Sequence, residues 1–293
     1  MPEPTGRPAV ATTRALRLQH VVVPGLLLLP AVGFLVLWFV IPLGQLFLLS
    51  LSDPRGAFVT YREILAGSVY RRVLVNTILV AANVTLISVA LGYPTAYVLT
   101  RLKGFWLALA FWCVLVPFWI SVLVRTFSWM LLLEAHGPIN AALLALHLAD
   151  RPLQLLFNDV GVYIGMVHVM LPYAVLPIYA GLLRIDHRLL LASDGLGASP
   201  WMTFRRVYLP LSLPGIGAAA ALVFLLSLGF FITPALLGSM SNLTLSMLIE
   251  NLVNERLVWP LAAAASFVLL AGTLLLLLIG ARLLPVRQMT LAG

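Results

Sequence analysis

The polar chemistry of this chain is concentrated in residues 184–214, a segment between two long apolar stretches. Asp186 has the side chain to cap a first helix, and Gly197 suits the left-handed conformation that ends one. Ser199 followed by Pro200 is the pattern of a second helix start, a capping residue before proline at the first helical position. The segment is therefore predicted to form two short helices.

Aromatic residues mark one face of the second helix. Trp201, Phe204 and Tyr208 recur at helical spacing, whereas Arg205 and Arg206 point to other faces. A polar two-helix segment on one side of an otherwise apolar chain is expected to bind a partner there.

The residue patterns of several enzymes are missing. A phosphate-binding loop needs Gly-Lys-Ser/Thr, but the only lysine, Lys103, is followed by Gly104 and Phe105. The His-Glu-x-x-His pattern of zinc proteases and the Gly-x-Ser-x-Gly pattern of serine hydrolases are also missing. We therefore expect no catalytic residues, no metal and no cofactor, and any ATP hydrolysis must belong to another chain.

Two ionisable residues lie within apolar stretches and could line a solute path. Arg125 could contact cargo, but it could also extend to the lipid head groups or pair with Glu134. His168 could face a cavity or be a buried histidine with its hydrogen bonds satisfied. Trp129 and Tyr173 could touch cargo, although packing is the commoner role of such aromatics.

Composition places these residues in a membrane protein. Apolar residues make up 62% of the 293 residues and charged residues 10%, against roughly 25% charged in soluble domains. The net charge of +8 is spread thinly between apolar stretches, so it indicates membrane orientation rather than nucleic-acid binding. The single Cys113 excludes an intrachain disulfide.

Six stretches each have the 20 or so apolar residues that cross a bilayer about 30 Å thick. They run from Val21 to Leu51, from 73 to 99, from Phe105 to about Val124, from Val160 to Leu183, from about Ile216 to Leu237 with a break at Pro234, and from Trp259 to Gly280. The chain is thus predicted to be an all-α membrane protein. A further surface helix is expected at Ile139 to Leu148, between the third and fourth spans.

No linker divides the chain. The expected units are a cytoplasmic tail at 1–20, a first span with an external loop at 21–72, a transmembrane domain at 73–282 and a cytoplasmic tail at 283–293.

Charge sets the orientation. With both termini, residues 101–104 and the 184–212 segment inside, eleven Lys and Arg face the cytoplasm and six face outward. Both termini and the two-helix segment are therefore predicted to be cytoplasmic.

Residues 191–216 resemble the coupling loop of the permease subunits of bacterial ABC importers. That family shows Glu-Ala-Ala, three residues, Gly, then about nine residues and Ile-x-Leu-Pro. Leu191, Ala192 and Ser193 stand at the Glu-Ala-Ala positions, Gly197 is the glycine, and Val207-Tyr-Leu-Pro210 closes the pattern. The site residues that the resemblance implies for this loop are Leu191, Ala192, Ser193, Gly197, Ala198, Phe204 and Pro210.

Further stretches resemble the spermidine/putrescine-type (polyamine and opine) branch of these permeases. They are Pro117-Phe-Trp-Ile-Ser-Val-Leu-Val-Arg-Thr-Phe-Ser-Trp129, Gly165-Met-Val-His-Val-Met-Leu-Pro172 and Gly229-Phe-Phe-Ile-Thr-Pro234. The resemblance covers roughly residues 70–282 and implies the type I importer permease fold, with the coupling loop between spans 4 and 5.

The resemblance also implies partners and a mechanism. The loop would insert into a cytoplasmic ABC ATPase dimer, whose ATP-driven closure would switch the membrane helices between inward- and outward-facing states. A second permease subunit, often non-identical, and an extracytoplasmic solute-binding protein would complete the importer in the bacterial inner membrane. Leu191 in place of the glutamate puts one polar contact with the ATPase in doubt.

The sequence therefore favours one half of the solute path of an ATP-driven importer, with polyamines or related small nitrogenous solutes as cargo. An ion-coupled secondary transporter is the alternative, disfavoured by the scarcity of intramembrane ionisable groups. An intramembrane enzyme is a third possibility.

Overall fold

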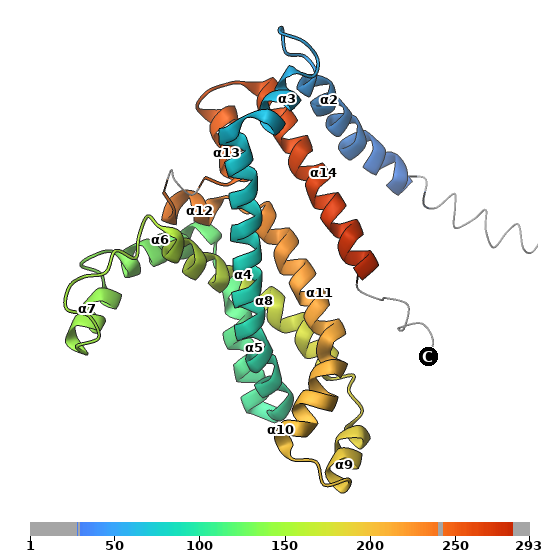
Figure 1. Ribbon diagram of the computed structural model, residues 1–293, viewed down its shortest axis with the longest axis vertical. Helices are drawn as coiled ribbons and strands as arrows, with labels where there is room; N and C mark the ends of the chain where they lie inside the picture. Colours follow the sequence, from blue (N-terminus) through green and yellow to red (C-terminus); the bar gives the residue numbers. More distant parts are fainter. Residues whose placement is uncertain (1–27, 29, 240–242, 284–293) are drawn as a thin grey trace, which may run out of the picture.

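The computed structural model describes residues 28, 30–239 and 243–283, and within these ranges it contains helices and connecting loops but no strand (Figure 1). The all-α prediction is confirmed. The predicted tails at 1–20 and 283–293, apart from Leu283, lie outside the described residues, as does the beginning of the first span. The helices before the two-helix segment are η1 (Val36–Val40), α2 (Ile41–Ser50), α3 (Val59–Ala66), α4 (Ser68–Arg101), α5 (Gly104–Trp119), α6 (Val122–Leu133), α7 (Pro138–Ala145) and α8 (Asp159–Leu182). The remaining helices are α9 (His187–Gly195), α10 (Pro200–Thr203), η2 (Phe204–Tyr208), α11 (Leu209–Leu228), α12 (Ile232–Leu237), α13 (Leu245–Asn254) and α14 (Trp259–Leu283).

The predicted six spans correspond to five long apolar helices and one bent pair among the described residues. The long helices are Pro30–Ser50, Ser68–Arg101, Asp159–Leu182, Pro200–Leu228 and Trp259–Gly280. The second span thus begins five residues earlier than predicted. The surface helix expected at Ile139 to Leu148 is α7.

The third span is not the straight helix predicted from Phe105 to Val124. Helix α5 ends at Trp119, and the chain beyond it bends by 101° into α6 (Figure 1). Ile120 and Ser121 between the helices have extended backbone. The apolar composition is continuous across this bend, so hydropathy alone cannot reveal it.

The predicted limits of the fifth span are wrong at both ends. The second short helix and the fifth span form one helix, because α10 continues through the π-helical turn η2 into α11. Pro210 and Pro214 lie within this helix instead of ending it. The helix breaks after Leu228, and Pro234 sits inside the next short helix, α12.

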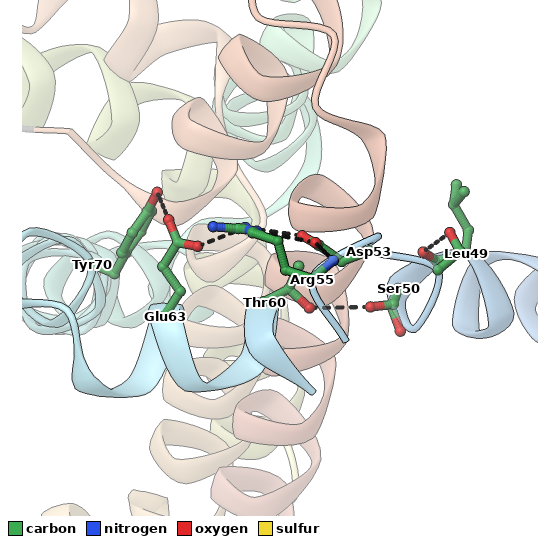
Figure 2. Close-up of polar contacts among 8 residues, drawn as sticks. Leu49, Ser50, Asp53, Arg55, Thr60, Glu63 and Tyr70 are labelled. Atoms are coloured by element: carbon green, nitrogen blue, oxygen red, sulfur yellow. Dashed lines mark hydrogen bonds and ion pairs between the residues drawn. The ribbon is translucent and has the colours of Figure 1, made fainter. Parts of the chain in front are cut away.

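Polar contacts secure the corner between the first two spans (Figure 2). The Thr60 hydroxyl donates to the backbone oxygen of Ser50 at 3.1 Å, and Arg55 bridges the carboxylates of Asp53 and Glu63 at 2.9 and 3.1 Å. The hydrogen bond from the Arg55 side chain lowers the pKa of Asp53 and raises that of the guanidinium. The corner lies at the end of the molecule opposite the two-helix segment (Figure 1).

The interior is built around α4, α8 and α11, which pack closely on one another. A Cβ placed on Gly92 of α4 would lie 3.0 Å from the Cβ of Ala174 in α8. Gly181 of α8 and Gly215 of α11 meet backbone to backbone, since a Cβ on Gly181 would lie 2.9 Å from the Cα of Gly215. Small residues allow such close helix approach in a membrane, where packing replaces the hydrophobic effect as the main attraction.

The crossing of α8 and α11 generates a prediction. Gly215→Val should lower the stability of the folded chain by about 1–3 kcal/mol, the usual cost of overpacking, because the obstructing atoms are backbone and cannot rotate away. Thermal denaturation in detergent, followed by size-exclusion chromatography, measures the loss. Gly272→Ala in α14 is the control, since a Cβ there meets nothing within 4 Å. Equal stability of the two variants would contradict the close crossing.

Candidate functional site

The two-helix segment begins as its residues predict. The Asp186 side chain accepts a hydrogen bond from the Arg188 backbone N–H at 2.8 Å and caps α9. The Ser199 hydroxyl accepts from the Met202 N–H and caps α10, with Pro200 in the first turn. Both caps satisfy N–H groups that a helix start leaves without an intrahelical partner.

Gly197 ends α9 in the left-handed conformation, with φ of 75°. Its N–H donates to the Asp194 carbonyl at 2.9 Å, and the Ala198 N–H donates to the Ser193 carbonyl at 3.2 Å. These two bonds form a Schellman motif, which turns the chain sharply after the helix. A Cβ on Gly197 would meet nothing within 4 Å, so the backbone conformation, and not crowding, is what requires glycine.

A side-chain contact joins the two short helices. The hydroxyls of Ser193 in α9 and Thr203 in α10 lie 2.9 Å apart. Ser193 stands where the importer permeases have their second alanine, so this departure from the pattern adds a contact that alanine could not make. The two helices are thereby tied into one unit.

The outer surface of this unit exposes large apolar side chains, set among charged residues such as Arg188 and Asp194. Leu191 is 59% exposed, Leu196 is 88% exposed and Trp201 is 68% exposed. Ala192 is exposed as well, whereas Ala198 is half-buried. Large apolar side chains at a water-exposed turn indicate a protein-binding surface.

The inner face of the unit rests on α4 through aromatic rings. Phe204 is stacked between Trp201 and Tyr208, and its ring meets Tyr93 at 6.2 Å edge to face. Tyr97 of α4 meets Tyr208 edge to face at 5.4 Å. The sequence indicated the aromatic face but not the tyrosines of α4 that receive it, because they lie about a hundred residues away in the chain.

Hydrogen bonds and a cation–π contact extend this junction. The Tyr93 and Ser212 hydroxyls lie 3.2 Å apart, which connects α4 to α11. Arg101 donates to the Tyr97 hydroxyl at 2.8 Å, and its guanidinium lies 5.0 Å from the centre of that ring. Pro210 lies in the first turn of α11, directly beyond this junction.

The four residues considered for the solute path lie near one another, but they form two pairs. Arg125 and Tyr173 line a cavity of about 160 Å³ together with Phe118, Ile120 and Phe230. In the second pair, the Trp129 indole N–H donates to His168 Nδ1 at 2.9 Å. Because Nδ1 accepts, the neutral imidazole carries its proton on Nε2.

Among the described residues, Arg125 does not pair with Glu134, one of the contacts considered from the sequence. It is 7% exposed, and its Nη1 donates to the backbone oxygen of Pro117 at 2.8 Å. Its Nε–H has no hydrogen-bond partner among the described residues. Pro117 belongs to the last turn of α5, whose carbonyls lack intrahelical partners because the helix ends at Trp119.

Thr126 and Thr233 form a contact that sequence reasoning missed. Their hydroxyls lie 3.1 Å apart, and both residues are buried. The contact joins α6 to α12, the short helices that follow the two breaks. Threonines are common in membrane helices, so nothing in the local pattern singles out this pair.

Within the part of the chain that the structure describes, His, Cys, Asp and Glu side chains nowhere gather in a group of three or more that could hold a metal ion. The geometry offers instead an exposed apolar docking unit at one end of the helix bundle and a small cavity beside two broken helices. Such an arrangement suits transport coupled to a partner protein.

Comparison with known proteins supports the same conclusion. Residues 88–285 match the family of binding-protein-dependent transport system inner membrane components. The spermidine/putrescine transport system permease protein PotB of Escherichia coli (strain K12) is 35% identical over 257 residues, which cover 85% of this chain and 93% of that protein. PotB of Salmonella typhimurium (strain LT2) is also 35% identical, over 85% of this chain and 89% of that protein.

A solved structure shares the fold. A chain of a bacterial ABC transporter that imports the acidic polysaccharide alginate superposes with a TM-score of 0.75 and 17% identity, over 95% of this chain and 99% of that one. The family match covers more than half of the sequence. The chain therefore belongs to the binding-protein-dependent transport system inner membrane components and is a multi-pass permease subunit of an ABC importer.

Proposed function

We propose that this permease imports polyamines or related small nitrogenous solutes, and that residues 184–214 couple it to a cytoplasmic ABC ATPase dimer. The cargo rests on the 35% identity to spermidine/putrescine transport permeases over most of the chain. The coupling role rests on the exposed apolar unit formed by α9 and α10.

The structure of this unit fits the transmission of movement. Its outer surface, with Leu191, Leu196 and Trp201, is available to an ATPase. On its inner side, the rings of Phe204 and Tyr208 pack on α4. The helix that carries these rings continues from α10 into α11. Movement of the docked ATPase would therefore displace α4 and α11 together, and these helices form the interior of the permease with α8.

The remaining partners and the orientation belong to the same proposal. A second permease subunit, not identical to this chain, would complete the solute path. An extracytoplasmic solute-binding protein would deliver cargo. A related fold has been solved for an alginate ABC transporter in complex with an alginate pentasaccharide-bound periplasmic protein. Both termini and residues 184–214 would face the cytoplasm of a bacterial cell, as the distribution of Lys and Arg favours.

Uptake measurements distinguish this function from an ion-coupled transporter. The chain would be reconstituted in proteoliposomes with its proposed partners, and radiolabelled putrescine and spermidine would be offered with ATP or with a proton or sodium gradient. We expect accumulation only with ATP, because the chain has no phosphate-binding loop and few intramembrane ionisable groups. Uptake driven by a gradient without ATP would refute the proposal, and ATP-driven uptake of an unrelated solute would refute the cargo alone.

Gly197→Val should abolish ATP-driven uptake while leaving membrane insertion intact. The left-handed conformation costs a β-branched residue about 1–2 kcal/mol or more, which would displace the Schellman turn and the docking unit. The matched control is Gly195→Val, two residues earlier, where the glycine is exposed, lies in the helix and has no atom within 4 Å of an added Cβ. Normal uptake by the Gly197 variant would contradict the coupling role.

Leu191→Glu tests the departure from the glutamate of the importer permeases. Restoring the carboxylate should increase the ATPase activity that depends on this permease, by roughly tenfold or more, because one hydrogen bond to a charged group contributes about 1.5–3 kcal/mol. Leu191→Gln is the control for size, since it lacks the charge. Unchanged ATPase activity in the Glu variant would show that position 191 makes no polar contact with the ATPase.

A further inference from the structure

Two helix breaks border the same cavity, the one that Arg125 lines. The first break is at Ile120 and Ser121, between α5 and α6, and the second is at Gly229 to Phe231, between α11 and α12. Phe118 and Ile120 line the cavity at the first break, and Leu226 and Phe230 line it at the second. Discontinuous helices in transporters mark places where the path and its moving parts are built.

The helices that follow the breaks pack on each other more than on the helices they continue. Helix α6 packs on α12 and α8 and has little contact with α5, and α12 packs on α6 and α8 and has little contact with α11. The buried Thr126–Thr233 contact joins them. Thr233 also packs tightly on α8, because its methyl group lies 2.6 Å from a Cβ built on Gly165. Helices α6 and α12 thus form one packed unit with a break on each side.

Arg125 crosses the first break. It lies in α6 and donates to the Pro117 oxygen in the last turn of α5, so it ties the unit beyond the break to the helix before it. A cation at a helix C-terminus is favoured by the partial negative charge of the free carbonyls. The Nε–H of the same side chain has no partner among the described residues, and Arg125 as a whole is one of the residues that line the cavity.

We infer that the α5/α6 break is a hinge of the transport cycle and that Arg125 is the positioning residue that latches it in the bent state. The extended residues Ile120 and Ser121 absorb the change in backbone angle, as hinge residues at helix ends do. Helices α6 and α12 move as one unit, and the neighbouring cavity gives the side chains of the hinge room to move. The latch bond to Pro117 breaks when the hinge opens.

Thiol reactivity at the hinge tests the latch in the full-length chain. Val122→Cys, at the half-buried first position of α6 and in the wall of the cavity, is placed in a Cys113→Ser background, because Cys113 is exposed. Adding Arg125→Met removes the donors but keeps a long side chain, and it should raise the rate of reaction with a small maleimide about tenfold or more, the factor that one hydrogen bond from a charged group represents. Arg125→Lys, which retains a donor, should restore part of the protection.

The control is Ser128→Cys in the same two backgrounds. Ser128 is exposed on α6, but it lies within the helix and away from the hinge. Its reaction rate should not respond to Arg125→Met. An unchanged rate at residue 122 would overturn the latch, and an equal rise at residues 122 and 128 would show general loosening instead of a hinge.

A cross-link tests whether α6 and α12 move together. Thr126→Cys with Thr233→Cys should form a disulfide under mild oxidation, and putrescine uptake by the assembled importer should survive it. Each single variant under the same oxidant is the control. Loss of uptake that returns on reduction would overturn the common unit. Lack of putrescine uptake by the importer with unsubstituted Thr126 and Thr233 would count against the proposed cargo, and the thiol rates at residue 122 would still decide the hinge.

Discussion

Every backbone N–H and C=O group of this chain that lies in lipid must find a partner within the protein, and the architecture follows from that constraint. Unbroken helices satisfy it internally, which is why five long helices account for most of the transmembrane region. The two breaks need other partners. At the first, Arg125 supplies a donor to the Pro117 carbonyl. At the second, the Ser227 carbonyl accepts from the Phe230 N–H at 3.3 Å, and the Ser246 hydroxyl donates to the Leu228 carbonyl at 3.0 Å.

The proposed coupling role requires the same bundle to remain tight while it transmits movement from one end. Close crossings at glycines hold α4, α8 and α11 together without large side chains between them. The docking unit then needs only one firm junction with the bundle, because a displacement of α4 would also displace α8 and α11, which pack on it. The tyrosines of α4 provide that junction, with Tyr93 reaching Ser212 and Tyr97 reaching the ring of Tyr208. The hydroxyl contact between Ser193 and Thr203 would hold α9 and α10 together during that movement.

Local chemistry in the sequence predicted local structure well. The caps at Asp186 and Ser199 and the left-handed Gly197 depend only on neighbouring residues, and all three are observed. The bend after Trp119 could not be predicted, since the same apolar run fits a straight or a bent span. Pro210 and Pro214 both lie inside the continuous helix Pro200–Leu228, where neighbouring helices can accommodate them. The role of Arg125 depended on where α5 ends, which composition does not specify.

A buried arginine beside the proposed path of a cationic solute raises an electrostatic difficulty that its geometry reduces. Within a membrane an uncompensated guanidinium would repel a polyamine strongly. Arg125 directs one amino group at the C-terminal carbonyls of α5, where the helix dipole places roughly half a negative charge. The charge is therefore partly neutralised where it lies, and it faces a cavity wall that includes the rings of Phe118 and Tyr173. The arginine can thus hold the helix break in place without acting as a charged barrier, so its presence is compatible with the proposed cationic cargo.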